Sequence, residues 1–173
     1  FEKLKANTTI NEVGISQKQA EEAGYLWVTN ATELKNALEA GESVMLGGNI
    51  DLSGVADWTM TTAYTAHFNG NGFTISNLTS TTQGLVTELN GATIQNLTIE
   101  GAEVSGSIVG ALANETTNAT INNVHIKGGS VSSTGRAGGL VGQAKNNTNI
   151  INSSSSATIS GAGMVGGLVG NLY

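Results

Sequence analysis

The stretch AGGLVGQAKNNTNIINSSSSATISGAGMVGGLVGNLY, residues 137–173, decides the fold prediction, because one phrase occurs in it twice. Gly-Leu-Val-Gly stands at residues 139–142 and again at residues 167–170. Two related phrases precede them, Gly-Leu-Val at residues 84–86 and Ile-Val-Gly at residues 108–110. A short phrase that recurs at intervals of roughly 20 to 50 residues is typical of a repeat protein.

A second phrase, Ile-x-Asn, alternates with the first. Its asparagines are Asn77, Asn96, Asn123 and Asn152, at steps of 19, 27 and 29 residues. The surrounding runs are rich in Ile, Val and Thr and are interrupted by Gly, Asn and Ser, which favours short strands and turns over helices. Because the phrases recur in order, we expect each coil to stack in parallel on the one before. The predicted fold class is therefore all-β, a parallel β-helix or solenoid.

The asparagines predict bends in the coil. Ile94 and Asn96 have the same parity in a strand, but Leu97 and Ile99 have the opposite parity, so the inward face changes after Asn96. Asn tolerates the left-handed backbone conformation that a tight corner requires. We expect an internal ladder in which Asn77, Asn96, Asn123 and Asn152 hydrogen-bond between stacked coils. The alternative is that these residues are surface turn asparagines.

The Gly-Leu-Val-Gly phrase predicts a short wall of the coil. Adjacent apolar residues cannot both point inward from a straight strand. Flanking glycines allow the chain to bend there, or allow a neighbouring coil to approach closely. We therefore expect coil corners at Gly84, Gly110, Gly139, Gly142, Gly167 and Gly170.

The chain divides into residues 1–26, an N-terminal segment expected to be helical and to act as a cap or linker, and residues 27–173, the β-helix repeat domain. A leading helix is expected at about residues 31–40. The uncovered end of a solenoid exposes strand edges and apolar interior, so we expect these short helices to cap the first coil.

Capping patterns support both helices. Ser16 is followed three residues later by Gln19, which is a capping-box pattern. Asn30 and Glu33 repeat that spacing, and Gly41 is a typical helix stop.

Residues 137–170 closely resemble the GLUG motif, a repeat of large bacterial surface proteins that include adhesins and some immunoglobulin A-cleaving metallopeptidases. Residues 49–79 resemble the opening coils that precede such repeats, and Thr32 to Leu38 resembles their leading helix. The resemblance covers roughly residues 27–173. It implies a right-handed parallel β-helix and an extracellular or cell-surface location.

Composition excludes several function classes. The 173 residues carry a formal net charge of −6 and form no basic stripe, which argues against nucleic-acid binding. The chain has no Cys, so disulfides and thiolate metal sites are excluded. No apolar run approaches the roughly 18 residues of a membrane span.

No catalytic, metal or cofactor site is predicted. The two histidines, His67 and His125, lie far apart, and no HExxH motif is present. The two aspartates stand near the first coil, whereas the one arginine, Arg136, stands several coils later. Acid–base catalysis needs two groups held at one scissile bond, and the sequence suggests no such pair. The sequence therefore predicts a protein that is not an enzyme.

The leading functional hypothesis is a non-enzymatic solenoid module of a bacterial surface or secreted protein, acting as an adhesin stalk or as a binding surface for a host or environmental glycan or protein. Loops at residues 54–66 and 113–119 are the candidate ligand contacts. Trp58 and Tyr64 could stack on sugar, or could pack against the flank of the coil.

Two alternatives remain. One is a filament subunit that self-assembles by head-to-tail coil stacking, with self-association through the C-terminal coil. This alternative arises because the ends of a solenoid carry unpaired strand edges. The stretch at residues 163–173 contains the last Gly-Leu-Val-Gly phrase and is followed by no polar helix or charged strand, so that we expect either further repeats or a partner there. The other is a polysaccharide-active β-helix enzyme.

Overall fold

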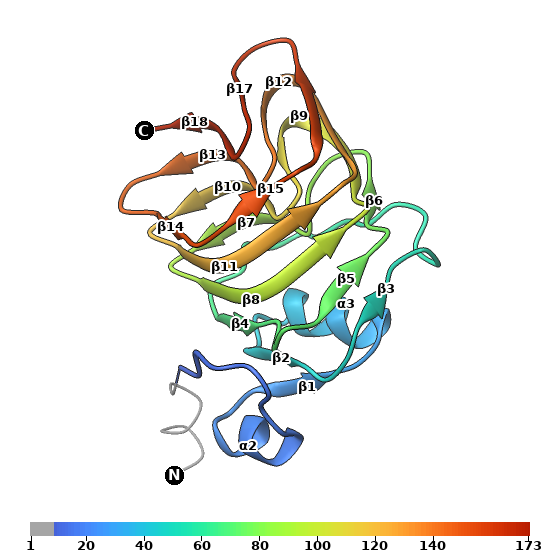
Figure 1. Cartoon of the computed structure of the whole chain (residues 1–173), viewed down its shortest axis with the longest axis vertical. Helices are drawn as coiled ribbons and strands as arrows, with labels where there is room; N and C mark the ends of the chain where they lie inside the picture. The colour runs from blue at the N-terminus through green and yellow to red at the C-terminus, as the bar shows by residue number, and fades with distance from the viewer. Residues whose placement is uncertain (1–8) are drawn as a thin grey trace.

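Over residues 9–173, the protein is a stack of β-coils with two short helices at the N-terminal end (Figure 1). The computed structural model describes residues 9–173. The helices are α2 (Gln17–Glu22) and α3 (Ala31–Glu39). The strands are β1 (Leu26–Val28), β2 (Val44–Leu46), β3 (Ile50–Asp51), β4 (His67–Asn69), β5 (Thr74–Ser76), β6 (Thr79–Ser80), β7 (Val86–Asn90), β8 (Thr93–Glu100), β9 (Glu103–Gly110), β10 (Ala113–Thr117), β11 (Thr120–Lys127), β12 (Ser130–Gly138), β13 (Val141–Lys145), β14 (Asn149–Ile151), β15 (Ser154–Ser155), β16 (Thr158–Gly161), β17 (Val165–Gly166) and β18 (Val169–Leu172).

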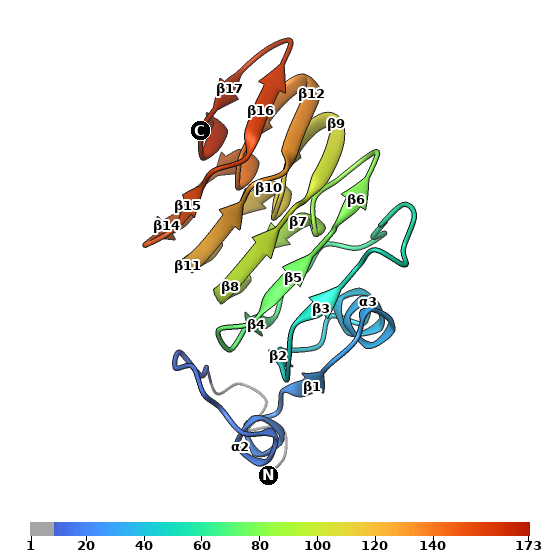
Figure 2. The same ribbon diagram turned by 45° about the vertical axis from the view of Figure 1, so that its right-hand side comes forward.

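The strands form three parallel sheets, which are the walls of the stack (Figure 2). Sheet A runs β1-β2-β4-β8-β11-β14, with β3, β5 and β15 alongside. Sheet B runs β7-β10-β13-β18, and sheet C runs β6-β9-β12-β16, with β17 alongside. Each coil is named here after its first strand in sheet A. All strand pairs within these sheets are parallel, which confirms the parallel β-helix predicted from the repeats.

The register confirms the repeat length. Between the β8 and β11 coils, Ile94 pairs with Ile121 and Glu100 with Lys127, an offset of 27 residues. Glu103 pairs with Ser130 at the same offset in sheet C. Equivalent side chains therefore lie directly above one another at the inter-strand spacing of about 4.8 Å.

The core is one apolar column that follows the stack. Phe68, Ile94 and Ile121 succeed one another on the inner face of sheet A, and all three are buried. Ile75, Ile99 and Ile126 form a parallel row. Each added coil covers the apolar row of the coil before it. Because fully burying such a side chain contributes about 1.5–3 kcal/mol, each added coil stabilises the stack.

The Gly-Leu-Val phrase is also a stacked unit, but its member in the β8 coil differs from the prediction. Val86 pairs with Ala113 and Ala113 with Val141, so Leu85, Leu112 and Leu140 succeed one another. The equivalent phrase is therefore Ala-Leu-Ala at residues 111–113. The predicted member, residues 108–110, instead pairs with residues 136–138 in sheet C. Sequence similarity favoured the wrong phrase because alanine replaces glycine and valine in this coil.

The predicted corner glycines are needed mainly for close approach. None of the six has a positive φ. A Cβ on Gly84 would lie 2.0 Å from the Gly110 carbonyl oxygen, and one on Gly110 would lie 2.5 Å from the Leu140 oxygen. The corner prediction is wrong for Gly142 and Gly170, which lie inside β13 and β18. Glycine is needed at both positions because backbone atoms of other residues lie too close for a side chain. A Cβ would lie 2.7 Å from the nearest such atom at Gly142 and 2.6 Å from it at Gly170.

Gly139 and Gly167 do stand at bends between strands, as predicted. A Cβ on Gly139 would lie 2.4 Å from the Gly167 carbonyl oxygen, whereas one on Gly167 would meet nothing within 4 Å. The difference arises because Gly139 lies beneath the last coil, while Gly167 is part of it.

The predicted bends at asparagine are confirmed. Asn77, Asn96, Asn123 and Asn152 all have φ between 51° and 61°, in the left-handed region. Asn123 Nδ2 donates to Asn96 Oδ1 at 3.0 Å, which forms one rung between coils. Asn152 Nδ2 donates to Asn122 Oδ1 at 3.3 Å instead of to Asn123.

The prediction of an internal ladder of four asparagines is wrong in two respects. Asn123 and Asn152 are exposed, because an asparagine at a corner directs its side chain outward. Asn77 belongs to a different corner, since Thr74–Ser76 pairs with Thr98–Glu100 and so places Asn77 level with Gly101. Gly101 also has a positive φ, 68°. Asn77 Nδ2 donates to Asp51 Oδ1 at 2.9 Å.

Helix α3 covers the N-terminal end of the core. Asn30 Oδ1 accepts from the Glu33 backbone N–H at 2.9 Å, which confirms the predicted N-cap. The buried face, Leu34, Ala37 and Leu38, joins the same apolar cluster as the sheet residues. The expected helix at about residues 31–40 is therefore present, and it caps the first coil as predicted.

The N-terminal segment docks on the outside of sheet A. In α2, Ser16 and Gln19 form the predicted capping box. Ile10 and Glu12 precede this helix, and their carbonyl oxygens accept hydrogen bonds from Asn69 Nδ2, both at 2.9 Å. Asn96 Nδ2 donates to the Asn11 oxygen at 2.9 Å. We call residues 10–15 the strap. Residues 1–8 of the expected helical segment lie outside the described residues.

Candidate functional site

The ionisable groups considered for catalysis lie apart in the fold. Asp51 accepts from the Ser53 backbone N–H at 2.9 Å, and Asp57 accepts from the Thr81 N–H at 2.9 Å. Arg136 donates to Gln143 in sheet B. The three groups therefore bond to different partners in the described structure. Within residues 9–173, no cluster of three His, Cys, Asp or Glu side chains is arranged to hold a metal ion.

The two histidines have separate environments. His125 contacts Ser154 Oγ through Nδ1 at 2.7 Å and Asn123 Oδ1 through Nε2 at 2.9 Å, on the outside of sheet A. His67 starts β4, and its Nδ1 is buried without a hydrogen-bond partner.

Trp58 and Tyr64, the predicted ligand contacts, are both 0% exposed. Trp58 Nε1 donates to the Leu85 carbonyl oxygen at 2.7 Å, and the Tyr64 hydroxyl donates to the Glu42 oxygen at 2.8 Å. Burial raises the pKa of the Tyr64 phenol well above its ordinary value. The prediction that these two rings meet a ligand is wrong, because both fill the core with their polar atoms bonded inside.

The loop that carries these rings is a wall of the β2 coil. The Trp58 backbone N–H donates to the Thr79 oxygen at 2.8 Å, and Tyr64 forms a parallel bridge with Leu89. Irregular chain therefore replaces the two strands that later coils place in sheets B and C. The other predicted loop, residues 113–119, is mostly β10.

The outer face of sheet C carries a regular array of hydroxyl groups. Thr79, Glu103, Ser130 and Thr158 succeed one another in register and are all exposed. A second row contains Ser105, Ser132 and Ser160. We call these two rows, with Thr81, the hydroxyl face.

Two shallow hollows lie on the hydroxyl face. The larger, of about 440 Å³, is lined by Thr81, Ser105, Gly106, Ser132, Ser133 and Thr134. The smaller, of about 220 Å³, lies beside it and includes Glu103. The hydroxyls can both donate and accept hydrogen bonds, so this face can bind a polar, uncharged ligand.

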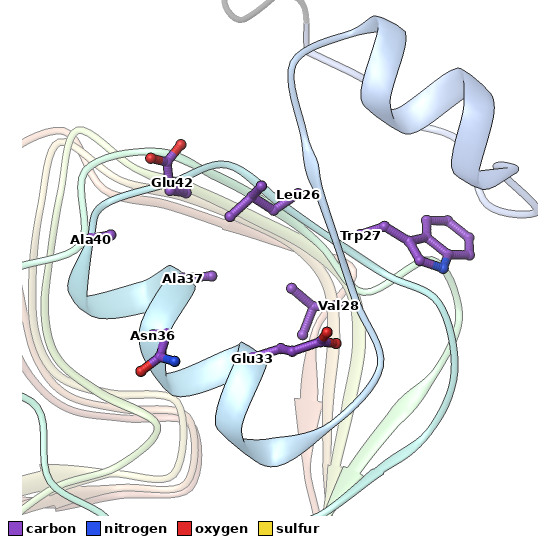
Figure 3. Close-up of a pocket in the computed structure, with 8 residues that line it drawn as sticks. All are labelled: Leu26, Trp27, Val28, Glu33, Asn36, Ala37, Ala40 and Glu42. Carbon is purple, nitrogen blue, oxygen red and sulfur yellow. The ribbon is translucent and has the colours of Figure 1, made fainter.

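A groove of about 400 Å³ lies between β1 and α3 at the N-terminal end (Figure 3). Leu26 and Val28 point toward α3, whereas Trp27 points to the opposite side of the strand. Ala37 of α3 and Ala40 at the C-cap of that helix face the groove, and their small side chains leave the space open. We call this feature the β1–α3 groove.

Two carboxylates border the β1–α3 groove, Glu33 near Val28 and Glu42 near Leu26 (Figure 3). Glu33 Oε1 accepts from the Thr29 backbone N–H at 2.9 Å, which fixes its position at the start of α3. Among the described residues 9–173, no Lys or Arg lines the groove. The sequence did not reveal this site, although small alanines in the last turn and at the C-cap of a helix that follows a short strand were a usable signal.

The last coil, residues 149–173, has the most exposed large apolar side chains. Leu172 is 73% exposed and Tyr173 68% exposed. Met164 and Val165 are also exposed. Arg136 lies 5.9 Å from the centroid of the Tyr173 ring.

Two family models match the chain. Residues 29–128 match the M26 IgA1-specific metallo-endopeptidase N-terminal region, and residues 133–160 match the GLUG motif. The second match confirms the resemblance identified in residues 137–170. No curated protein sequence matches the chain. No helix in residues 9–173 is long and apolar enough to cross a membrane.

A solved structure has a similar fold. It is described as a "putative immunoglobulin A1 protease" from Bacteroides ovatus. The TM-score is 0.61 at 17% sequence identity, over 91% of this chain. The chain spans 63% of that protein's length. At this identity the likeness concerns the fold.

Proposed function

Because the chain belongs to the family of M26 IgA1-specific metallo-endopeptidase N-terminal regions, we propose that it is a non-enzymatic solenoid module of a secreted or surface protein of a bacterium and that it binds a neutral glycan. The single observation that carries the proposal is the hydroxyl face of sheet C. Its hydroxyl groups repeat from coil to coil, as the hydroxyl groups of a polysaccharide repeat from sugar to sugar.

Rigidity favours binding at this face. Ser105, Ser132 and Ser160 stand on paired strands, so their positions are set by the backbone ladder. A preorganised site loses little conformational entropy on binding. The face offers one carboxylate, Glu103, and the whole chain carries a net charge of −6. Acidic polysaccharides are therefore disfavoured relative to neutral ones.

A retention experiment tests the proposal. The full chain is run through native gels that contain one of several neutral polysaccharides, and its mobility is compared with that in a plain gel. We expect at least one polysaccharide to retard the chain, and the variant Thr81→Val/Ser105→Ala/Ser132→Ala to run unretarded. The matched control, Ser153→Ala/Ser154→Ala/Ser156→Ala on other surfaces of the last coil, should keep the retardation.

Either of two results contradicts the proposal. One is an equal retardation of the hydroxyl-face variant and the control variant. The other is the absence of retardation by every neutral polysaccharide in the panel. Circular dichroism of both variants establishes that they keep the fold of the parent chain.

A stalk is a second candidate function, and the continuous core favours it. One apolar cluster extends from Val28 in β1 to Ala144 in β13 without interruption. Such a column resists bending between coils. Small-angle X-ray scattering of the chain fused between two globular domains should give a fixed distance between those domains; a broad distribution of distances would contradict this role.

Head-to-tail filament assembly receives less support. An incoming coil needs an open coil on which to stack, and α3 covers the core at the N-terminal end.

A further inference from the structure

Strand β1 is an edge strand with one free side. It pairs with β2 in sheet A and with no other strand of the described residues 9–173. The Leu26 N–H donates to Ser43, and the Val28 oxygen accepts from Gly47. Residues alternate in the direction of their backbone groups, so the N–H and C=O of Trp27 point away from β2. The pair can therefore bond to an added strand.

The neighbouring backbone donors on that side are already bonded. The Tyr25 N–H donates to the Ala20 oxygen at 2.9 Å, and the Thr29 N–H donates to Glu33. Pairing on the free side of β1 would therefore centre on Trp27. In an antiparallel pair, one residue exchanges both of its backbone hydrogen bonds with the residue opposite, and here that residue would lie opposite Trp27.

The β1–α3 groove would receive side chains of such a strand. The residue opposite Trp27 would direct its side chain to the Trp27 side, and its two neighbours would direct theirs toward α3. These two side chains would lie over Ala37 and Ala40, in the open volume of about 400 Å³. Small aliphatic side chains suit this apolar floor.

The charges of the groove select the partner. Glu33 and Glu42 border its two ends, and its lining within the described part of the chain contains no cationic side chain. A strand with Lys or Arg on both sides of an aliphatic centre complements this arrangement. The last coil of a second copy does not, because residues 149–173 contain no charged side chain.

We propose that the β1–α3 groove binds an extended basic peptide segment of another protein by antiparallel strand addition to β1. The backbone of Trp27 supplies the pairing groups, and Ala37 and Ala40 leave room for the aliphatic side chains of the peptide. Glu33 and Glu42 bind its basic residues. Addition of a peptide strand to a sheet edge beside a side-chain groove is a general mode of peptide recognition.

Fluorescence anisotropy with a labelled peptide, Lys-Ser-Val-Thr-Val-Ser-Lys, tests the proposal. Its central Thr would lie opposite Trp27, with the valines over the helix and the lysines near the acids. We expect saturable binding to the full chain. The variant Glu33→Gln/Glu42→Gln should bind roughly tenfold more weakly, the expected sum of two exposed ion pairs. The amide introduced by Glu33→Gln retains an oxygen that can accept from Thr29, so the helix start is preserved.

Two controls separate this mode from nonspecific attraction. The variant Glu88→Gln/Glu100→Gln removes the same charge from the β4 and β8 coils and should bind the peptide as the parent does. A peptide N-methylated at the central Thr cannot donate to the Trp27 oxygen and should not bind at concentrations that saturate the parent complex.

Several outcomes would overturn the proposal. They are no saturable binding of the parent peptide, equal weakening by the two acid variants, and undiminished binding of the N-methylated peptide. Sedimentation of the chain alone should give a monomer. A dimer that the peptide dissociates would assign the groove to a second copy and would also overturn the proposal.

Discussion

The β11 coil and the last coil are built from the same phrases, yet their equivalent residues differ in burial. Ile121 pairs with Ile150, and Val131 pairs with Ile159. Ile121 and Val131 are buried, whereas Ile150 and Ile159 are half-buried. The difference lies in the neighbours, because the β11 coil is covered on both sides and the last coil on one side. In a solenoid, a residue's contribution to stability therefore depends on its position in the stack as much as on its type.

At the N-terminal end of the stack, a helix and the strap cover the terminal coil. There α3 places Leu34 and Leu38 on the core, so Val28 and Val44 beneath them are fully buried. The strap buries amide side chains on the outside of sheet A at the same end, such as Asn69 and Gln95. An end can thus be closed by a helix in place of a coil.

The largest expected contrast concerns the stacked leucines. Leu140 is fully buried, and its N–H donates to the Leu168 oxygen of the last coil at 3.0 Å. Leu140→Ala should lower the free energy of unfolding by about 2–5 kcal/mol, because it leaves a cavity. Leu168→Ala removes a half-buried side chain and should cost about 1 kcal/mol. Urea unfolding followed by circular dichroism measures both, and equal losses would contradict the dependence on neighbours.

The glycines provide the second contrast. A Cβ on Gly110 would lie 2.5 Å from the Leu140 oxygen and the Val141 Cα, whereas one on Gly167 would meet nothing within 4 Å. Gly110→Ala should destabilise the chain by about 1–3 kcal/mol through overpacking, and Gly167→Ala should change stability by less than about 0.5 kcal/mol. Thermal unfolding of the two variants measures the difference. A larger loss of stability for Gly167→Ala than for Gly110→Ala would contradict this prediction.

The corner asparagines give the third contrast. Substitution by glycine keeps the left-handed conformation and removes only the side-chain hydrogen bonds. Asn96 is 8% exposed and bonds to Asn11 and Asn123. Asn96→Gly should cost about 1–3 kcal/mol because it leaves buried polar groups unpaired, whereas Asn152→Gly, at an exposed corner, should cost less than about 1 kcal/mol. Hydrogen exchange of strap amides gives a second readout, which only Asn96→Gly should accelerate.

The smallest effect concerns pH and a single surface carboxylate. Hydrogen bonds lower the pKa of Asp51 below its ordinary value of 3.8, and the bond from Asn77 contributes more than either of those from Ser53. The stabilisation from this ionised group is present above pH 3.8 and is lost as the pH falls through the lowered pKa. Asn77→Ala should move the Asp51 pKa back toward 3.8 in an NMR titration of its carboxyl carbon.

For Lys145, beside the last coil, stability depends on pH in the opposite direction. The Glu115 carboxylate raises the Lys145 pKa above 10.5, so the associated stabilisation is lost as the pH rises through the raised value. Asn77→Ala should leave the Lys145 pKa unchanged, and a parallel change in both groups would indicate a general loss of structure.

Much of the fold was predictable because the chain repeats itself. Ile-x-Asn at a step of 27 residues set the register between the β8 and β11 coils. The backbone needs of a corner select Asn or Gly locally, so Asn96 and Asn123 could be placed at bends from sequence alone. The caps at Ser16 and Asn30 are also local patterns.

The candidate sites were less predictable, because each joins segments that are distant in sequence. Trp58 and Tyr64 are in a stretch that looks like an exposed loop, but their burial follows from its position against β6 and β7. Asn77 matched the Ile-x-Asn phrase and still belongs to another corner, since the β4 coil spaces its strands differently. The β1–α3 groove arises from a strand and a helix that meet in space.

The sequence by itself determined the parallel β-helix, its repeat length and its left-handed corners, because these depend on periodicity and on the backbone preferences of single residues. Only the tertiary structure decided which side chains are exposed, where the strap docks and which strand edge is free. Those features depend on what lies above and below each coil, and no local stretch of sequence carries that information.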